Sequence, residues 1–231
     1  MVRAITTIVC SLLLLLSFSC SREDTGPQET IPDSGIVTFT AMTGQGETRS
    51  SQEGSFETGD AIGVFAIEPK TGVYWAVNNK YTYDGQKFKP EAEADNIIVT
   101  VGTDFDFYVY YPFKAGQTDI TGISHTAGNQ SDKPGWLSAD FMTATYTDPI
   151  RNYTVPLHFK HRMSTVEVRI DRNDGVREAT MENVRRTSRF NLLTGGITTD
   201  ESRGSCTMHK YSETGGTTVF RVTIPAQRLT T

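Results

Sequence analysis

Residues 105–111, Phe-Asp-Phe-Tyr-Val-Tyr-Tyr, alternate bulky apolar side chains with a second set of residues over seven positions. Successive side chains of a β-strand point to opposite faces of a sheet, so this period of two predicts a strand with one buried face. Other segments of the chain repeat the pattern, and we expect strands in them as well. They are residues 36–42, 62–66, 81–88, 97–101, 153–159, 166–170 and 220–224.

Turn signals separate these strands, and helical patterns are missing from the sequence. Asp84-Gly85 lies between two apolar runs, and glycine accepts the positive φ that a tight hairpin requires. No stretch of 12 or more residues has apolar side chains at helical spacing; the best, residues 177–191, is too polar and too rich in Arg. Short strands with turns between them indicate antiparallel sandwiches rather than a parallel α/β fold. We therefore predict an all-β protein.

Composition excludes several classes of protein. The 231 residues are 37% hydrophobic and 21% charged, which is typical of a globular chain and not of a disordered one. Twenty-two Lys and Arg against 27 Asp and Glu give a net charge of −5, so the basic surface that nucleic-acid binding needs is missing. Three cysteines without a CxxC pair exclude a disulfide-dense scaffold and a zinc ribbon. The length allows one large domain or two small ones.

The first 19 residues are predicted to be an export signal. A basic start at Arg3 precedes an apolar run over residues 4–16, which is too short to cross about 30 Å of hydrocarbon. Cys20 follows small residues and resembles the acylated cysteine of a bacterial lipoprotein signal. The alternative is simple cleavage near Ser19, which leaves Cys20 as an incidental thiol. Several acyl chains, palmitate among them, would be enough for stable membrane anchoring.

Residues 20–35 are predicted to form a flexible tether. Beyond Cys20 this stretch has no aromatic residue and almost no apolar content, so it cannot bury enough surface to fold. Cleavage after residue 19 would remove one positive charge and no acid, leaving 21 positive and 27 negative charges. The mature chain would then carry a net charge of −6. Cys206 lies in an apolar-alternating segment, and we expect it to be a small buried hydrophobic residue rather than a nucleophile.

No catalytic, metal-binding or cofactor motif is present. His158 and His161 are three residues apart, so on one strand they would point to opposite faces and could not share an ion without a bulge. The sequence has no HExxH, GxSxG, Walker A or GxGxxG motif. Asp106 and Asp140 are expected on a sheet face or in a turn rather than in a catalytic pair. We predict that the protein is not an enzyme and that it uses no cofactor.

A long polar loop over residues 116–135 leaves two interpretations open. It is rich in Gly, Thr and Asn, which suits an adaptable binding loop but also a plain surface excursion; the second is favoured. Trp136 at its end is either an exposed stacking platform or a core residue where the chain re-enters the sheet. The core position is favoured.

Five blocks in order resemble the fimbrillin-like (Mfa-like, type V pilin) proteins of Gram-negative gut and oral bacteria. The first, residues 59–66, reads GDAIGVFA and is similar to the motif G-D-x-I-G-V-[FY]-A of that family. The others are residues 81–90, 107–112, 140–144 and 157–163, which read YTYDGQKFKP, FYVYYP, DFMTA and LHFKHRM. The five blocks fall in order within residues 36–170, whereas the C-terminal part matches more thinly.

The resemblance implies two transthyretin-like, antiparallel β-sandwich (Greek-key) domains, expected at residues 36–160 and 161–231. The second is short for a complete sandwich and is expected to be incomplete, which leaves two interpretations open: the sequence is truncated, or this member lacks the usual C-terminal donor strand. The family also implies a lipoprotein exposed on the outer membrane and located in a fimbrium. Its role would be that of a stalk, anchor or tip component in cell adhesion.

Members of the family that polymerise are cleaved by a protease during assembly. The resemblance implies that the cleavage site in this chain is Arg49. An Arg-specific protease removes the first strand, here residues 36–42, and the emptied groove accepts a strand from another subunit. Residues 44–54 are small and polar, which suits an extended protease substrate, although Arg49 is otherwise one more solvated cation. The expected partners are other fimbrial subunits and a host or bacterial receptor or glycan. The alternative function is a glycan-binding surface lipoprotein that uses exposed aromatic residues such as Trp75, Trp136 or Tyr110.

Overall fold

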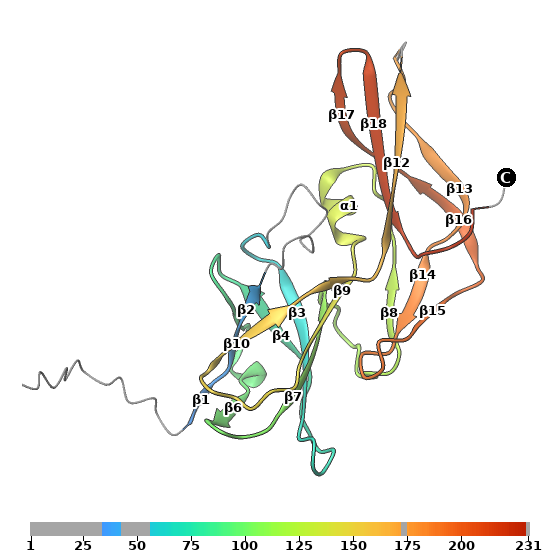
Figure 1. Cartoon of the computed structure of the whole chain (residues 1–231). Helices are drawn as coiled ribbons and strands as arrows, with labels where there is room; N and C mark the ends of the chain where they lie inside the picture. Colours follow the sequence, from blue (N-terminus) through green and yellow to red (C-terminus); the bar gives the residue numbers. More distant parts are fainter. Residues whose placement is uncertain (1–33, 43–55, 172–174, 230–231) are drawn as a thin grey trace, which may run out of the picture. The chain divides into compact units, whose positions relative to one another are not determined.

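The structure is a computed structural model that describes residues 34–42, 56–171 and 175–229 (Figure 1). The described residues belong to one compact unit that spans residues 32–231. Strands make up most of the described chain, beside one short α-helix and one 3-10 turn. The all-β prediction is confirmed. No helix within the described ranges is long and apolar enough to span a bilayer.

An eight-stranded sheet forms the first part of the fold. Its strands lie in the order β10-β2-β5-β4-β3-β7-β9-β11, and every neighbouring pair is antiparallel except β10 with β2. Their bounds are β2 Thr38–Met42, β3 Ala61–Ile67, β4 Tyr74–Tyr83, β5 Phe88–Pro90, β7 Asp106–Tyr111, β9 Met142–Tyr146, β10 Thr154–His158 and β11 Lys160–His161. Phe159 alone separates β10 from β11 along the chain, so the sheet curls until its two ends meet.

The inside of this sheet holds the largest hydrophobic core. Side chains from all eight strands or their ends contribute, among them Phe39, Tyr81, Phe107 and Leu157, each fully buried. A two-stranded sheet of β1 (Ser34–Ile36) and β6 (Ile98–Thr100) lies at one end, with the 3-10 turn η1 (Glu93–Asp95) before β6. The hairpin predicted at Asp84-Gly85 is confirmed, since β4 and β5 pair there and Gly85 has a φ of +102°.

The remaining strands form three smaller sheets. β12 (Ser164–Asp171), β18 (Thr217–Ile224) and β17 (His209–Thr214) make one, and β13 (Thr180–Arg185) and β16 (Arg203–Thr207) make another. Their apolar side chains meet around Phe220 and Val222. The third sheet joins β15 (Ile197–Thr199), β14 (Thr187–Phe190) and β8 (Ile123–Thr126), so a strand from the polar loop pairs with one more than 60 residues later.

The polar loop therefore contains structure that the sequence pattern does not predict. Besides β8 it leads into α1 (Lys133–Ser138), which Asp132 caps by accepting a hydrogen bond from the Gly135 N–H at 2.8 Å. Trp136 on α1 is only 2% exposed, so the prediction of a core position is confirmed. Cys206 is a free, buried thiol, as expected. The domain boundary near residue 160 stays a prediction.

Candidate functional site

The N-terminal segment over residues 34–42 occupies an inner position in the main sheet (Figure 1). Its second half, β2, lies between β10 and β5. The parallel register with β10 matches Thr38 with Thr154 and Met42 with His158. Its first half, β1, pairs with β6 instead. A segment at one end of the chain is thus held by strands that come much later in the sequence.

Two side chains of this segment fill the core completely. Val37 and Phe39 are both fully buried, whereas Met42 near the end of the strand is about half exposed. The Phe39 ring meets Tyr81 and Phe107 edge to face, with ring centroids 5.1 and 5.3 Å apart. Burial of a side chain of this size contributes about 1.5–3 kcal/mol. The buried face that the apolar alternation predicts for residues 36–42 is thus formed by Val37 and Phe39.

Backbone hydrogen bonds hold the segment to two different stretches of chain, one near β6 and one near β10. The Val37 N–H donates to the Ile97 carbonyl at 2.9 Å, and the Thr38 N–H donates to the Tyr153 carbonyl at 2.7 Å. β2 is in register with β10 over five residue pairs, but with β5 over the single pair of Phe39 and Phe88. Loss of the segment would therefore leave the backbone of β10 without this partner, beside two empty apolar positions.

The structure does not describe the two residues that are predicted to be lipidated and cleaved. Cys20 and Arg49 both lie outside the described residues. Lipidation and cleavage at these positions remain predictions.

The histidines and acids discussed above have separate structural roles. His161 Nδ1 lies 2.7 Å from Asp140 Oδ2, whereas His158 is exposed at the rim of a surface pocket. Asp106 lies on β7, where burial raises the pKa of its carboxyl group. Within the described part of the chain, no group of three His, Cys, Asp or Glu residues is placed to hold a metal ion.

Two of the three aromatic residues considered for stacking on glycans are buried in the structure. Trp136 is 2% exposed and stacks on His209, and Tyr110 is fully buried beneath Phe141. The glycan-stacking alternative is therefore wrong for these two residues, because their rings complete the core, in agreement with the favoured core position of Trp136. Trp75 is 59% exposed and lies edge to face against Phe105.

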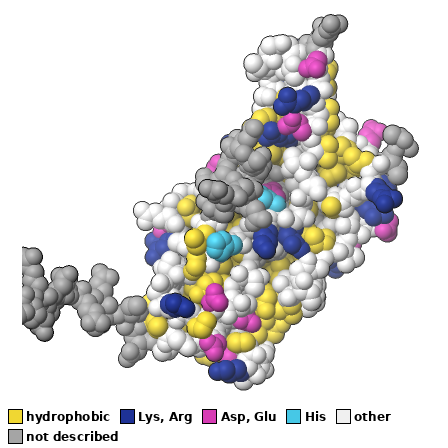
Figure 2. Space-filling view, in the orientation of Figure 1, with side chains coloured by type: hydrophobic (Ala, Val, Ile, Leu, Met, Phe, Trp, Pro, Cys, Tyr) yellow, Lys and Arg dark blue, Asp and Glu magenta, His cyan; other side chains and the backbone are white. Residues whose placement is uncertain are grey.

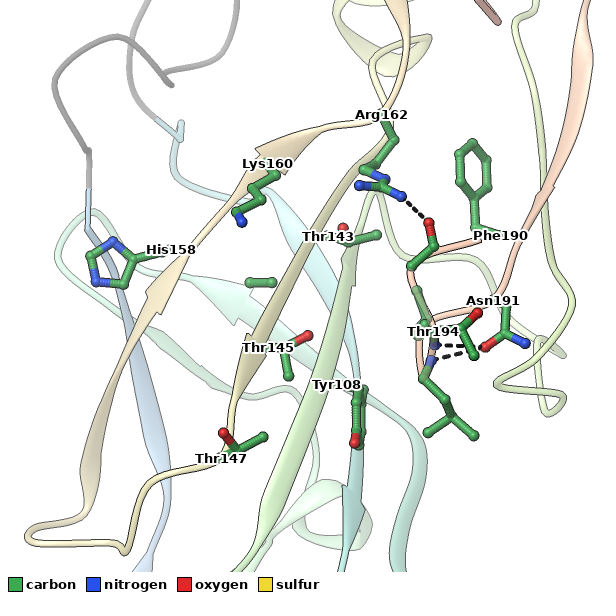
Figure 3. A pocket seen from close by; sticks show the side chains of 14 residues that line it. Tyr108, Thr143, Thr145, Thr147, His158, Lys160, Arg162, Phe190, Asn191 and Thr194 are labelled. Carbon is green, nitrogen blue, oxygen red and sulfur yellow. Dashed lines mark hydrogen bonds between the residues drawn. The ribbon is translucent and has the colours of Figure 1, made fainter. Parts of the chain in front are cut away.

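A polar pocket of about 530 Å³ lies beside β9, β10 and β11 (Figure 3). Its lining comes from four separate stretches of chain, including the turn after β14. No local motif joins these stretches, so the sequence pattern does not predict the pocket. The sequence signal that relates to it is the alternation along residues 158–162, which places a basic side chain at every second position.

Comparison with known proteins identifies relatives by sequence and by fold. A family model described as fimbrillin-like matches residues 48–230. No curated protein matches the chain. A crystal structure of a proposed cell adhesion protein from Bacteroides ovatus is 18% identical, with 84% of this chain and 78% of that chain covered and a TM-score of 0.60. One from Bacteroides uniformis is 21% identical, with 83% and 76% covered and a TM-score of 0.57. At these identities the two structures show a shared fold.

Proposed function

The chain belongs to the fimbrillin-like family, and from this premise we propose that it is a surface-exposed, lipid-anchored fimbrial subunit or anchor or tip component that acts in cell adhesion. Fimbrillin-like proteins are structural and adhesive proteins rather than enzymes. The lipid anchor would be attached at Cys20 and would hold the protein at the outer membrane. Its partners would be other fimbrial subunits and a receptor or glycan on another cell.

We propose that assembly proceeds by β-strand exchange. Cleavage after Arg49 would release the segment of residues 34–42, and a strand from another subunit would take its place. The observation that carries this proposal is the complete burial of Val37 and Phe39 on a segment that pairs with strands far later in the chain. An incoming strand would find unpaired backbone groups along β10 for its hydrogen bonds and two apolar positions to set its register.

Proteolysis of the exported protein tests this mechanism. Treatment with an Arg-specific protease should produce oligomers that survive SDS at room temperature and dissociate on heating, because strand addition buries a continuous row of backbone hydrogen bonds. The matched control is Arg49→Lys, which keeps the charge but removes the cleavage site. This variant should stay monomeric under the same treatment.

Two outcomes of this experiment would contradict the mechanism. If the cleaved protein loses residues 34–42 and remains a stable monomer, exchange at this groove is wrong. If the Arg49→Lys variant forms the same oligomers, the cut that matters lies elsewhere.

Of the three aromatic residues Trp75, Trp136 and Tyr110, Trp75 is the one that is exposed, so the glycan-binding alternative depends on it. Its exposed ring is flanked by the exposed apolar residues Val73 and Tyr74. A flat ring of this kind can stack on a sugar. Loss of retardation on glycan-containing affinity gels in the Trp75→Ala variant would favour this alternative, and unchanged retardation would exclude the ring from binding.

A further inference from the structure

The pocket beside β9 has one basic wall. His158, Lys160 and Arg162 line it from alternate positions of a single extended stretch, and no carboxylate is among the described residues that line it. Lys160 forms no ion pair with any residue that the structure describes. Figure 2 shows histidine and basic side chains close together in the middle of this face of the molecule. Two positively charged side chains therefore face a pocket with no carboxylate among the described residues that line it.

The floor of the pocket is a row of hydroxyl groups. Thr143, Thr145 and Thr147 come from alternate positions at and beyond β9, as Figure 3 shows. Thr143 is in register with Lys160 on β11, and Thr145 is in register with Tyr108 on β7. Each hydroxyl can both donate and accept a hydrogen bond, so the floor suits a ligand that carries several hydroxyl groups of its own.

The opposite wall is a turn that is already fixed. The Asn191 side-chain oxygen accepts hydrogen bonds from the backbone N–H groups of Leu193 and Thr194, at 3.0 and 3.1 Å. Arg162 reaches across and donates from one terminal nitrogen to the Gly195 carbonyl (Figure 3). The Arg162 Nε is buried and has no hydrogen-bond partner. The pocket is open to solvent, so a ligand would meet the terminal N–H groups of Arg162 rather than this buried atom.

We propose that this pocket binds a sugar that carries a carboxylate or a sulfate group. Lys160 and Arg162 would bind the anionic group, because charge-assisted hydrogen bonds to such groups are the strongest available here. The threonine row and Thr194 would bind the hydroxyl groups of the ring, and the Tyr108 side chain would contact its apolar face. A volume of about 530 Å³ falls in the range of small-molecule sites. The pocket adjoins the strand groove at the end of β10, where His158 is in register with Met42, but the proposal does not require strand exchange.

Ligand-detected NMR titrations of the full-length chain test the proposal with four probes. D-glucuronate and D-glucose 6-sulfate supply the two anionic groups, D-glucose is the neutral match, and inorganic sulfate is added as a competitor. Both acidic sugars should bind saturably, about tenfold or more tightly than glucose, since the anionic group adds charge-assisted bonds. Sulfate should displace them only at much higher concentration than glucose 6-sulfate does.

Two variants and one matched control locate the binding. Lys160→Gln should weaken binding of both acidic sugars about fivefold or more, and Thr145→Val should weaken it about threefold. Lys70→Gln makes the same charge change at a side chain that is 78% exposed on the far β3–β4 turn, and it should leave affinity unchanged. All three should keep the wild-type melting temperature.

Several results would overturn the proposal. Absence of saturable binding, or equal affinity for glucose, would show that the pocket does not select an acidic sugar. Equal displacement by free sulfate would show that it binds only an anion. An unchanged affinity in Lys160→Gln would place any binding elsewhere.

Discussion

Gly63 lies in the middle of the GDAIGVFA block, at a point where two side chains fill the space that a Cβ atom would need. A Cβ built there would stand 2.2 Å from the Tyr110 ring and 2.6 Å from the Asn78 Oδ1 atom. Neither group can move freely, because the Tyr110 hydroxyl donates to Asn78 Oδ1 at 2.7 Å and its ring is fully buried. Asn78 itself has a φ of +57° at an irregular point in the pairing of β3 with β4. The glycine is therefore a packing requirement of the sheet.

Gly63→Ala should lower the free energy of unfolding by about 1–3 kcal/mol, because the new methyl group must displace a buried ring. Urea denaturation measures the change. The control is Gly128→Ala, where a Cβ would meet nothing within 4 Å, and this variant should be close to wild type. An unchanged stability for Gly63→Ala would mean that Tyr110 and Asn78 can repack at little cost.

Three glutamines, Gln117, Gln130 and Gln227, each pair with both backbone groups of one residue through their side chains. The Gln130 amide donates to the Thr223 carbonyl at 2.7 Å and accepts from the Thr223 N–H at 2.8 Å, and it is fully buried. Gln117 makes the same pair of bonds with the backbone of Ser124, but in a less buried position. Gln130 thus satisfies a residue of β18 as a neighbouring strand would. It ties the loop before α1 to the C-terminal strands.

Gln130→Ala should destabilise the protein by about 2–5 kcal/mol, because it leaves both backbone groups of Thr223 buried and unpaired. Gln117→Ala removes the same chemistry where water can replace it, and it should cost about 1 kcal/mol or less. Thermal unfolding of the two variants gives the comparison. Equal losses would show that the burial around Gln130 does not prevent water from reaching Thr223.

The strand β8 introduces a pH dependence through His125. Burial of this side chain lowers the pKa of the imidazole below its ordinary value of 6.5, while its hydrogen bond to the Ala139 carbonyl acts in the opposite direction. As the pH falls below about 6.5, the unfolded chain takes up a proton that the folded protein resists. The free energy of unfolding should therefore fall between pH 7 and pH 5.5, and this contribution should be constant above pH 7.

The variant His125→Gln should make the stability less dependent on pH over this range, since its amide can still donate to Ala139 but does not titrate. His158→Gln changes an exposed histidine and serves as the control, with the wild-type slope expected. Urea titrations at pH 7.0, 6.25 and 5.5 measure the slopes. If His125→Gln retains the full slope, other groups account for it.

Elements with strong apolar alternation could be predicted from sequence, and polar ones could not. β7, β10 and β18 each place large apolar side chains at regular positions, so their strands follow from the pattern. β8 and β14 consist largely of Ser, Thr, His and Arg, and their pairing depends on a distant partner. α1 is six residues long and contains Pro134 and Gly135, so helical periodicity has no length in which to appear. The lining of the pocket beside β9 comes from four separate stretches of chain, and only the folded protein brings these stretches together.

At the scale of the whole molecule, the N-terminal segment of residues 34–42 pairs with strands that lie far away in the sequence. Thr38 and Thr154, whose hydroxyl oxygens lie 3.1 Å apart, are 116 positions apart in sequence. In the main sheet, β2 lies between β10 and β5. Contacts of this separation form late, after the loop between them has been ordered. Removal of the segment should therefore leave the other strands able to fold, with a defined empty groove.

A peptide of residues 34–42 should bind that groove and restore stability after cleavage at Arg49. The monomeric fraction of the cleaved protein, freed of its own segment, should melt at a lower temperature than the intact chain, and added peptide should raise the melting temperature with concentration. A hundredfold excess over the dissociation constant corresponds to about 2.7 kcal/mol of stabilisation. The peptide with Phe39→Ala should fail, since loss of a buried phenylalanine costs about 3–5 kcal/mol. The peptide with Met42→Ala, changed at a side chain that is half exposed, should work nearly as well as the natural one. If the melting temperature does not fall when residues 34–42 are removed and does not rise when the peptide is added, the segment does not stabilise the sheet.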